Sequence, residues 1–343
     1  MNTIDLRSDT VTRPTPAMLA AMLAAEVGDD VYDEDPTVRR LETELAARFG
    51  LAAGLFCPSG TMTNQLAIMA HCAPVSEVIC EATAHVYLWE VGGIMHHARA
   101  SVALLPGDRG RLSAAQIEAA IRPTNNVHYP TTSLVCLENT HNRGGGSCYA
   151  WSDLEEIAAL TKQHGLALHL DGARIFNALV ATRQRSEDYG QLFNSISVCL
   201  SKGLGAPVGS VLLGSADFIQ KCKRLRKLFG GGWRQAGYLA AAGLFALDHN
   251  IDRLADDHRR AARLAEALRP LPYVAEILAP ETNLLLFSLD ESRLAVTDFL
   301  RQLEAQGIRA SGFGGSWVRF VTHLDVDDDM VARVMAAVAD LAA

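Results

Sequence analysis

A single lysine, Lys202, stands just after the apolar run 197–200, and glycines follow it at positions 203, 205 and 209. The run is typical of a buried strand. A lysine that such a strand holds out of water has a lowered pKa, so its neutral amine can form a Schiff base with a carbonyl group. The alternative is a solvated lysine that caps the strand. The glycines leave room beside the amine for a flat ring and a charged group.

A second charged residue, Asp171, ends another apolar run, in HLDGAR (169–174), 31 residues before Lys202. A buried carboxylate needs a partner, and one alternative is an ion pair with Arg174. In a parallel sheet, however, both strand ends meet at the carboxyl edge, where α/β sheets bind ligands. Pyridoxal phosphate (PLP) needs an amine for its Schiff base and a carboxylate that keeps its pyridine nitrogen protonated. The pair therefore predicts a PLP site.

The stretch PSGTMTNQ (58–65) supplies a candidate phosphate site. Ser59, Gly60 and Thr61 follow a strand-like segment and open a helix, whose first N–H groups and positive dipole end attract anions. The alternative is an ordinary helix N-cap. Arg234, after the three glycines of FGGGWRQAG, is a candidate second phosphate contact or a surface arginine on a flexible loop.

His85, in CEATAHVYLWEVGG, follows another predicted strand. Its flat ring could stack on the pyridine ring of the cofactor, and the alternative is a buried core histidine. The histidines form no HxxxH or HxH pair with nearby carboxylates, so the sequence predicts no catalytic metal.

The elements that must position these residues alternate between short apolar runs and helical patterns. Strands are predicted at 78–80, 102–105, 133–138, 167–170, 195–200 and 210–213. Helices are predicted at 36–49, 61–71 and 152–164, the last with a capping box from Ser152 to Glu155. The nearly continuous apolar strands favour an α/β architecture with a largely parallel sheet covered on both faces.

The composition changes after a long helical pattern, 236–268, in which we expect a break near Asn250. Strands at 284–289 and 317–321 and helices at 296–306 and 328–341 then predict a small α+β unit. We therefore predict a large domain, residues 1–248 with an N-terminal segment 1–25, and a small C-terminal domain, residues 249–343.

Composition narrows the class of protein. The chain has 343 residues, 49% of them hydrophobic, which is enough for a sizeable core and two domains. Its net charge of -8, without a basic run, disfavours nucleic acid as a partner. No apolar stretch reaches the roughly 18 residues of a membrane span, and the start of the chain lacks the apolar core of a signal peptide. With seven cysteines and no CxxC pair, these features predict a cytoplasmic protein.

Taken together and in order, several blocks of the sequence resemble the L-threonine aldolases, the low-specificity and L-allo-threonine enzymes. The blocks are LRSDTVTRP (6–14), GDDVYDEDPTVRRLE (28–42), PSGTMTNQLA, HVYLWEVGG, LENTHNRGGG (137–146), HLDGARIFNA (169–178), CLSKGLGAPVGS and GGGWRQAG. The C-terminal unit is matched mainly through VRFVTH (318–323). The resemblance implies a PLP-dependent transferase of fold type I, the aspartate aminotransferase fold, with a mostly parallel seven-stranded sheet.

For the cofactor, the resemblance implies that Lys202 forms the Schiff base and that Asp171 pairs with the pyridine nitrogen. His85 stacks on the ring. The phosphate is held by Ser59, Gly60 and Thr61, with help from Arg234, which a neighbouring subunit could supply.

For the substrate, the resemblance implies that Ser8, Arg174 and Arg319 bind the carboxylate and that His128 lies near the hydroxyl group. Arg174 thereby also lies beside the cofactor, and its planar fork suits a carboxylate. Tyr32 belongs to a loop that could reach into a neighbour's site, because the family usually forms homotetramers, dimers of dimers with shared active sites.

The implied reaction is PLP-dependent retro-aldol cleavage of L-threonine or L-allo-threonine, or of other β-hydroxy-α-amino acids such as phenylserine. The products are glycine and an aldehyde, which is acetaldehyde for threonine. His85 or His128, directly or through water, is the candidate base for the hydroxyl proton. The alternatives are another PLP enzyme, such as an aminotransferase or a β-eliminating lyase, and a non-catalytic PLP-binding protein.

Two positions depart from the family pattern. Asp33 stands where members of the family usually have glycine, and His96 and His97 replace small or apolar residues. These departures bear on substrate range rather than on the type of reaction.

Overall fold

The computed structural model describes residues 3–341 of the chain. Its largest element is a seven-stranded sheet with the strand order β2-β8-β7-β6-β5-β3-β4. Neighbouring strands are parallel except around β8, which runs antiparallel to both β7 and β2. The predicted α/β fold with a mostly parallel sheet is therefore confirmed.

The strands coincide with the apolar runs of the sequence. Their bounds are β2 (Ala53–Cys57), β3 (Ser76–Glu81), β4 (Ser101–Leu105), β5 (Thr131–Glu138), β6 (Ala167–Gly172), β7 (Ser195–Cys199) and β8 (Ser210–Gly214). β3, β7 and β8 are buried along their whole length, as expected of strands with both faces covered.

The helices of this part of the chain pack on the sheet or on one another, and the first of them packs on the last. They are α1 (Pro16–Leu23), α2 (Pro36–Arg48), α3 (Gly60–His71), α4 (His85–Leu88), α5 (Ala114–Ala120), α6 (Trp151–Gln163), α7 (Ile175–Thr182), α8 (Ser186–Leu192), α9 (Ala216–Leu228) and α10 (Gly237–His249). α2 begins with a proline after the capping side chain of Asp35 and ends before Gly50, which has a φ of 65°. No helix within residues 3–341 is long and apolar enough to cross a membrane.

The capping box expected at Ser152 is wrong. α6 begins one residue earlier, at Trp151, after Ala150, which has no side chain that could cap the helix. Ser152 is therefore already inside the helix, whereas a capping serine must precede it in an extended conformation. A capping box does form at α5, between Ser113 and Gln116.

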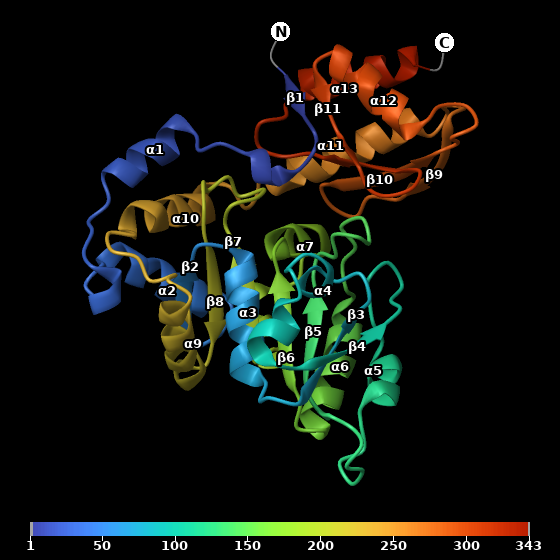
Figure 1. Cartoon of the computed structure of the whole chain (residues 1–343). Coiled ribbons are helices and arrows are strands. Elements are labelled where there is room, and N and C mark those ends of the chain that lie inside the picture. Colours follow the sequence, from blue (N-terminus) through green and yellow to red (C-terminus); the bar gives the residue numbers. More distant parts are fainter. Residues whose placement is uncertain (1–2, 342–343) are drawn as a thin grey trace.

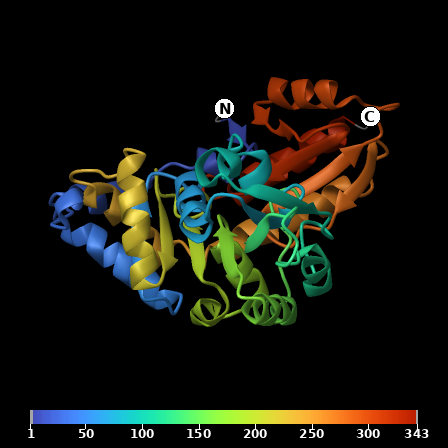
Figure 2. The ribbon, with the colours of Figure 1, turned by 60° about the horizontal axis from the view of Figure 1, so that its bottom comes forward.

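The long helical pattern breaks near Asn250, as predicted, into α10 and α11 (Leu254–Leu268). A second, antiparallel sheet follows, with the order β12-β13-β10-β9. Its strands are β9 (Val274–Leu278), β10 (Leu284–Leu289), β12 (Ser311–Gly312) and β13 (Trp317–Val321), accompanied by α12 (Val296–Ala305) and α13 (Asp328–Asp340). Figure 2 shows this C-terminal unit, in orange and red, gathered at one end of the molecule.

The start of the chain packs on the C-terminal unit. β1 (Ile4–Asp5) pairs in parallel with β11 (Ile308–Arg309), and Ile4 and Leu6 belong to the hydrophobic core of that unit. The domain boundary near residue 248 stays a prediction. In Figure 1 the arrows of β5 and β6 point toward the C-terminal unit, which therefore faces the carboxyl edge of the large sheet.

Candidate active site

Asp171 lies buried at the carboxyl end of β6, beside Glu138 of β5 in the strand register. Its two carboxylate oxygens accept hydrogen bonds from Asn64 Nδ2 at 2.9 Å and from the backbone N–H of Ala173 at 3.1 Å. The alternative ion pair with Arg174 does not form, because Arg174 turns to Asp9. Within residues 3–341, no ion pair neutralises Asp171.

Lys202 follows β7 and is half-buried, with Nζ 3.7 Å from the Sγ atom of Cys199. Its backbone carbonyl accepts a hydrogen bond from Thr12 Oγ1 at 3.0 Å. Gly60 lies so close that a Cβ atom there would stand 2.6 Å from Cys199 Sγ. The start of α3 is thus pressed against the residues around Lys202, and only glycine fits at this contact.

The first turn of α3 is arranged as the phosphate prediction requires. Ser59 is the N-cap, and its Oγ accepts a hydrogen bond from the backbone N–H of Met62 at 3.2 Å. The first N–H groups of a helix have no partner inside it, so those of Gly60 and Thr61 can bind an anion. Thr63 anchors this turn to the strand before Lys202 through a 2.6 Å hydrogen bond with Ser197.

His85 opens α4, and its Nδ1 lies 3.0 Å from Glu90 Oε1. The Glu90 carboxylate also accepts hydrogen bonds from Asn64 at 2.9 Å and from Gln65 at 2.5 Å. Burial lowers the pKa of His85, but the hydrogen bond to Glu90 and the charge of Asp171 outweigh it, so the pKa lies above its ordinary value. Because Glu90 holds Nδ1, the neutral ring keeps its free lone pair on Nε2.

Asn64 links the two carboxylates to a buried histidine. Its Nδ2 donates hydrogen bonds to the carboxylates of Asp171 and Glu90, while its Oδ1 lies 3.1 Å from Nε2 of His169. Burial lowers the pKa of His169 to about 4, so this ring is neutral and donates its Nε2 proton to Asn64. Asn64 is thereby fixed with its amide nitrogen toward Asp171.

The structure brings Arg174 and Arg319 to the N-terminal segment on either side of Ser8, and their predicted role in binding the substrate carboxylate stays a prediction. Arg174 forms a buried bidentate pair with Asp9, at 2.7 and 2.6 Å. Arg319 donates to the backbone carbonyl of Arg7 at 2.8 Å, so both guanidinium groups bind the neighbours of Ser8. Burial of Asp9 opposes ionisation, but Arg174 outweighs it and holds the pKa of that carboxyl at about 2.

Arg319 is the less satisfied of the two arginines. Its Nη1 donates to Asn142 Oδ1 at 2.9 Å, but its buried Nε has no partner among the described residues. Burial, and next the charge of Arg174, lower the pKa of Arg319 to about 10. Since Arg174 already engages Asp9, Arg319 is the guanidinium group with free capacity for a substrate carboxylate.

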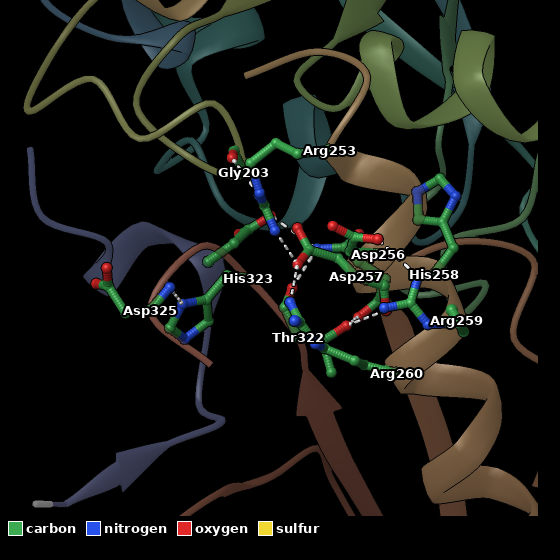
Figure 3. A network of polar contacts seen from close by, with 12 residues as sticks. Gly203, Arg253, Asp256, Asp257, His258, Arg259, Arg260, Thr322, His323 and Asp325 are labelled. Atoms are coloured by element: carbon green, nitrogen blue, oxygen red, sulfur yellow. Dashed lines mark hydrogen bonds and ion pairs between the residues drawn. The ribbon is translucent and has the colours of Figure 1, made fainter. Parts of the chain in front are cut away.

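A polar network ties the loop of Lys202 to the strand that carries Arg319 (Figure 3). Arg253 reaches the backbone carbonyl of Gly203 at 3.5 Å and pairs with the buried Asp257. The backbone carbonyl of Asp257 accepts a 2.6 Å hydrogen bond from Thr322, which directly follows β13. α11 therefore fixes the distance between Lys202 and Arg319.

Tyr32 and Arg234 lie together, but on an exposed loop cluster outside this group. Arg234 pairs with Asp29 at 2.8 Å and lies over the Tyr32 ring at 5.9 Å. No contact of either side chain with Lys202 or Asp171 occurs within the described residues. In one chain, the structure does not bring Arg234 to the start of α3.

His128 is also separate from the others. It lies exposed on the loop between α5 and β5, with its backbone N–H bonded to Asn126 Oδ1 at 3.0 Å. This loop precedes β5, so it lies at the amino edge of the sheet, opposite the ends that carry Asp171 and Lys202 (Figure 1, the teal-green loop at the bottom). Within one chain, only His85 of the two candidate bases reaches the site.

The structure shows where two of the residues that depart from the family pattern lie. Asp33 has a φ of 60°, in the left-handed region, where glycine is strain-free and aspartate is among the tolerated residues. His97 lies in a short π-helical turn, Ile94–Ala98, and packs edge-on against Phe229 at 4.7 Å. Among the residues that the structure describes, neither Asp33 nor His97 contacts Lys202 or Asp171.

Four residues of the site were not singled out from the sequence: Asp9, Asn64, Glu90 and Glu138. Each lies inside one of the family blocks, and Asp9, Asn64 and Glu90 lie within five residues of a candidate that was named, whereas Glu138 has no such neighbour. Their polar type within otherwise apolar segments was the available signal, since buried polar side chains need partners.

Comparisons with known proteins agree with this geometry. The family model described as beta-eliminating lyase matches residues 5–292. The chain is 45% identical to low-specificity L-threonine aldolase 1 of Arabidopsis thaliana, over 94% of this chain and 92% of that protein. It is 44% identical to the low specificity L-threonine aldolase of Escherichia coli (strain K12), over 97% of both chains.

Among solved structures, a threonine aldolase of Leishmania major superposes with a TM-score of 0.85 at 24% identity, covering 99% of this chain and all (100%) of that one. A serine palmitoyltransferase of Sphingomonas wittichii superposes with a TM-score of 0.77 at 16% identity, covering 99% of this chain and 87% of that one. At such identities the likeness shows the fold alone, which is the predicted fold type I.

Proposed function

This chain belongs to the beta-eliminating lyase family, among the low-specificity L-threonine aldolases, and we propose that it cleaves L-threonine and L-allo-threonine to glycine and acetaldehyde with PLP. Other β-hydroxy-α-amino acids, such as phenylserine, are included in the proposal. The observation that carries it is the pair of strand ends on one sheet edge, the amine of Lys202 and the un-neutralised carboxylate of Asp171.

The residues present fit PLP. A buried carboxylate without an ion pair needs a cation, and a protonated pyridine nitrogen would provide it. The start of α3 offers Ser59, Gly60 and Thr61 to a phosphate group, and His85 would stack on the ring. When bound, PLP supplies a carbonyl carbon for the amine of Lys202 and a ring that withdraws electrons from the substrate's Cα.

The substrate would be held by its carboxylate. Arg319, whose buried Nε has no partner among the described residues, binds it, with Arg174 and Ser8 alongside. This orientation decides which bond at Cα breaks, and for an aldolase it must be the bond to Cβ. The Asp9–Arg174 pair keeps the second guanidinium group from turning away.

The hydroxyl proton of the substrate needs an acceptor as the aldehyde leaves. His85 is the candidate in the same chain, because Glu90 holds Nδ1 and leaves the lone pair of Nε2 free. His128 could act only from another copy, or through a rearrangement, given its place at the amino edge of the sheet. His85 is therefore the base that we propose.

The remaining proposals concern assembly and location. Large apolar side chains are exposed near the outer loops, on α1 and around α4: Leu19, Leu23, Tyr32, Leu88, Trp89, Val91 and Met95. They support a homo-oligomer, a tetramer built from dimers, in which a neighbouring copy supplies Tyr32, His128 and Arg234. The seven cysteines are all free and buried, which supports a reducing compartment such as the cytoplasm.

The test is aldehyde release from L-threonine by the purified protein with PLP, followed through coupled alcohol dehydrogenase. We expect release that falls by at least about a thousandfold in Lys202→Ala and stays normal in Lys162→Ala, at an exposed lysine on α6. Ammonia or a keto acid in place of aldehyde would support elimination or transamination instead. Normal turnover in Lys202→Ala would contradict the proposed role of Lys202.

A further inference from the structure

The region that is proposed to bind the substrate carboxylate holds more positive charge than one carboxylate needs. Two neighbouring guanidinium groups, those of Arg174 and Arg143, are close enough for their charges to lower the pKa of Arg319. Asp9 neutralises Arg174. Within residues 3–341, no carboxylate lies at ion-pair distance from Arg143 or Arg319, so two positive charges remain uncompensated in a chain of net charge -8.

Arg143 is held in position without being neutralised. Its Nη1 donates to the backbone carbonyl of Phe313 at 2.6 Å, and its guanidinium group lies 4.4 Å from the Phe313 ring centre and 6.0 Å from that of Trp89. These contacts fix the planar group and leave its other N–H donors available. Arg143 directly follows Asn142 in the chain, and the side chain of Asn142 accepts a hydrogen bond from Arg319.

Phe313 is shared by both unpaired arginines. Arg319 lies 4.7 Å from the same ring centre, so both guanidinium groups contact one aromatic side chain. The cavity beside Arg143 has a volume of about 270 Å³, and Thr83, Leu286, Phe313 and Trp317 line it. Arg143 is its only charged lining residue among those described, and Thr83 lies two residues before His85.

We propose that Arg143 binds a second carboxylate, on the side chain of the substrate, and that the chain cleaves β-hydroxy-α-amino dicarboxylic acids such as 3-hydroxyaspartate. The inference rests on the proposed aldolase function and names a substrate class for it. A substrate with one carboxylate would satisfy Arg319 and leave Arg143 uncompensated. A substrate with two carboxylates would compensate the charges of both Arg319 and Arg143.

The reaction balances without another reactant. The bond between Cα and Cβ of 3-hydroxyaspartate breaks, and the β-hydroxyl group gives up its proton as its oxygen forms the carbonyl of glyoxylate. The electron pair of the broken bond stays on Cα, which then takes up one proton, so the second product is glycine. Arg143 takes no part in the bond changes and acts only on the leaving fragment's carboxylate.

The experiment compares kcat/KM for L-threonine and for L-3-hydroxyaspartate, measured as acetaldehyde and glyoxylate release from the PLP-loaded protein. In Arg143→Gln we expect the fall with 3-hydroxyaspartate to exceed the fall with L-threonine by about tenfold or more, as loss of a charged hydrogen bond implies. Arg143→Lys, which keeps the charge, should restore part of the difference. The same exchange at the exposed Arg301, on α12, is the control.

Equal falls with both substrates would mean that Arg143 merely supports Phe313, and would overturn the inference. A wild-type protein that releases acetaldehyde from L-threonine but no glyoxylate from 3-hydroxyaspartate would also overturn it, and would leave the proposed function standing. A protein that releases neither product would overturn the function on which the inference rests.

Discussion

Two groups of functional candidates have opposite surroundings. The strand-end cluster, comprising Asp9, Asn64, Glu90, Asp171 and Lys202, lies at the carboxyl edge of the sheet, where its three carboxylates are buried and hydrogen-bonded. The outer loops, which carry Asp29, Tyr32, His128 and Arg234, are largely exposed.

The same kind of aspartate–arginine pair occurs in both groups. Asp9 and Arg174 are 0% and 7% exposed in their side chains, whereas Arg234, which pairs with Asp29, is 57% exposed. A charge buried in the strand-end cluster must be paired, while one on the outer loops is already solvated. The contrast agrees with our proposals that the cluster forms within one chain and that the outer loops contribute to a site only in an assembly.

The largest expected effect comes from breaking the buried pair. Asp9→Asn leaves Arg174 buried and uncompensated, so the free energy of unfolding should fall by about 3–5 kcal/mol in urea denaturation. Asp29→Asn is the matched change on the outer loops and should leave the denaturation midpoint unchanged within error. Equal effects of the two changes would contradict the contrast.

The pH dependence of the Asp9 contribution has a definite sign. The folded-state pKa of Asp9 is about 2, below its ordinary value. The stabilisation is therefore fully present above the ordinary pKa near 3.8 and is lost as the pH falls through about 2. Asp9→Asn should consequently remove part of the loss of stability on acidification between these pH values.

A smaller effect is expected from Glu90→Gln, which keeps the shape of the side chain but removes its charge. The pKa of His85 should fall because Glu90 raises it in the folded protein. If neutral His85 is the base, the acid limb of the kcat/KM profile for L-threonine should shift to lower pH. The control is Glu118→Gln on the exposed face of α5, and an unmoved limb would point to another base.

The smallest expected signal tests the outer loops in the assembly. Lys202→Ala removes the amine, and the double variant His128→Ala/Arg234→Ala removes the groups that we propose to come from a neighbour. Mixed and refolded together, the two inactive proteins should regain about a quarter of the wild-type activity, because one site of each hybrid dimer is intact. No recovery in hybrids would mean that these groups act within their own chain.

The sequence predicted the positions of strands and helix ends where signals from neighbouring residues determine them. Apolar runs located the strands of the large sheet, and Pro36 and Gly50 located the ends of α2, because these signals depend on local backbone preference and burial. The capping box at Ser152 failed although the signal is local, since one residue of shift in the helix start removes it.

The sequence did not predict which side chains pair with each other when they lie far apart in the chain. Arg174 has Asp171 three residues away, yet it pairs with Asp9, 165 positions earlier. Arg319 likewise binds Asn142, 177 positions earlier. A sequence shows that a buried arginine needs an acceptor but not which acceptor, because that depends on how separate elements pack.

The sequence by itself therefore determined which chemical groups stand at the strand ends, namely the amine of Lys202 and the carboxylate of Asp171. Their type and their position after apolar runs follow from local order along the chain. Only the tertiary structure decided which of the other candidates join them. It brought Arg174 and Arg319 to the two sides of Ser8, placed His128 at the opposite edge, and, within residues 3–341, left Arg143 and Arg319 without a carboxylate. These outcomes depend on the packing of the N-terminal segment and the C-terminal sheet over the carboxyl edge, which no local pattern encodes.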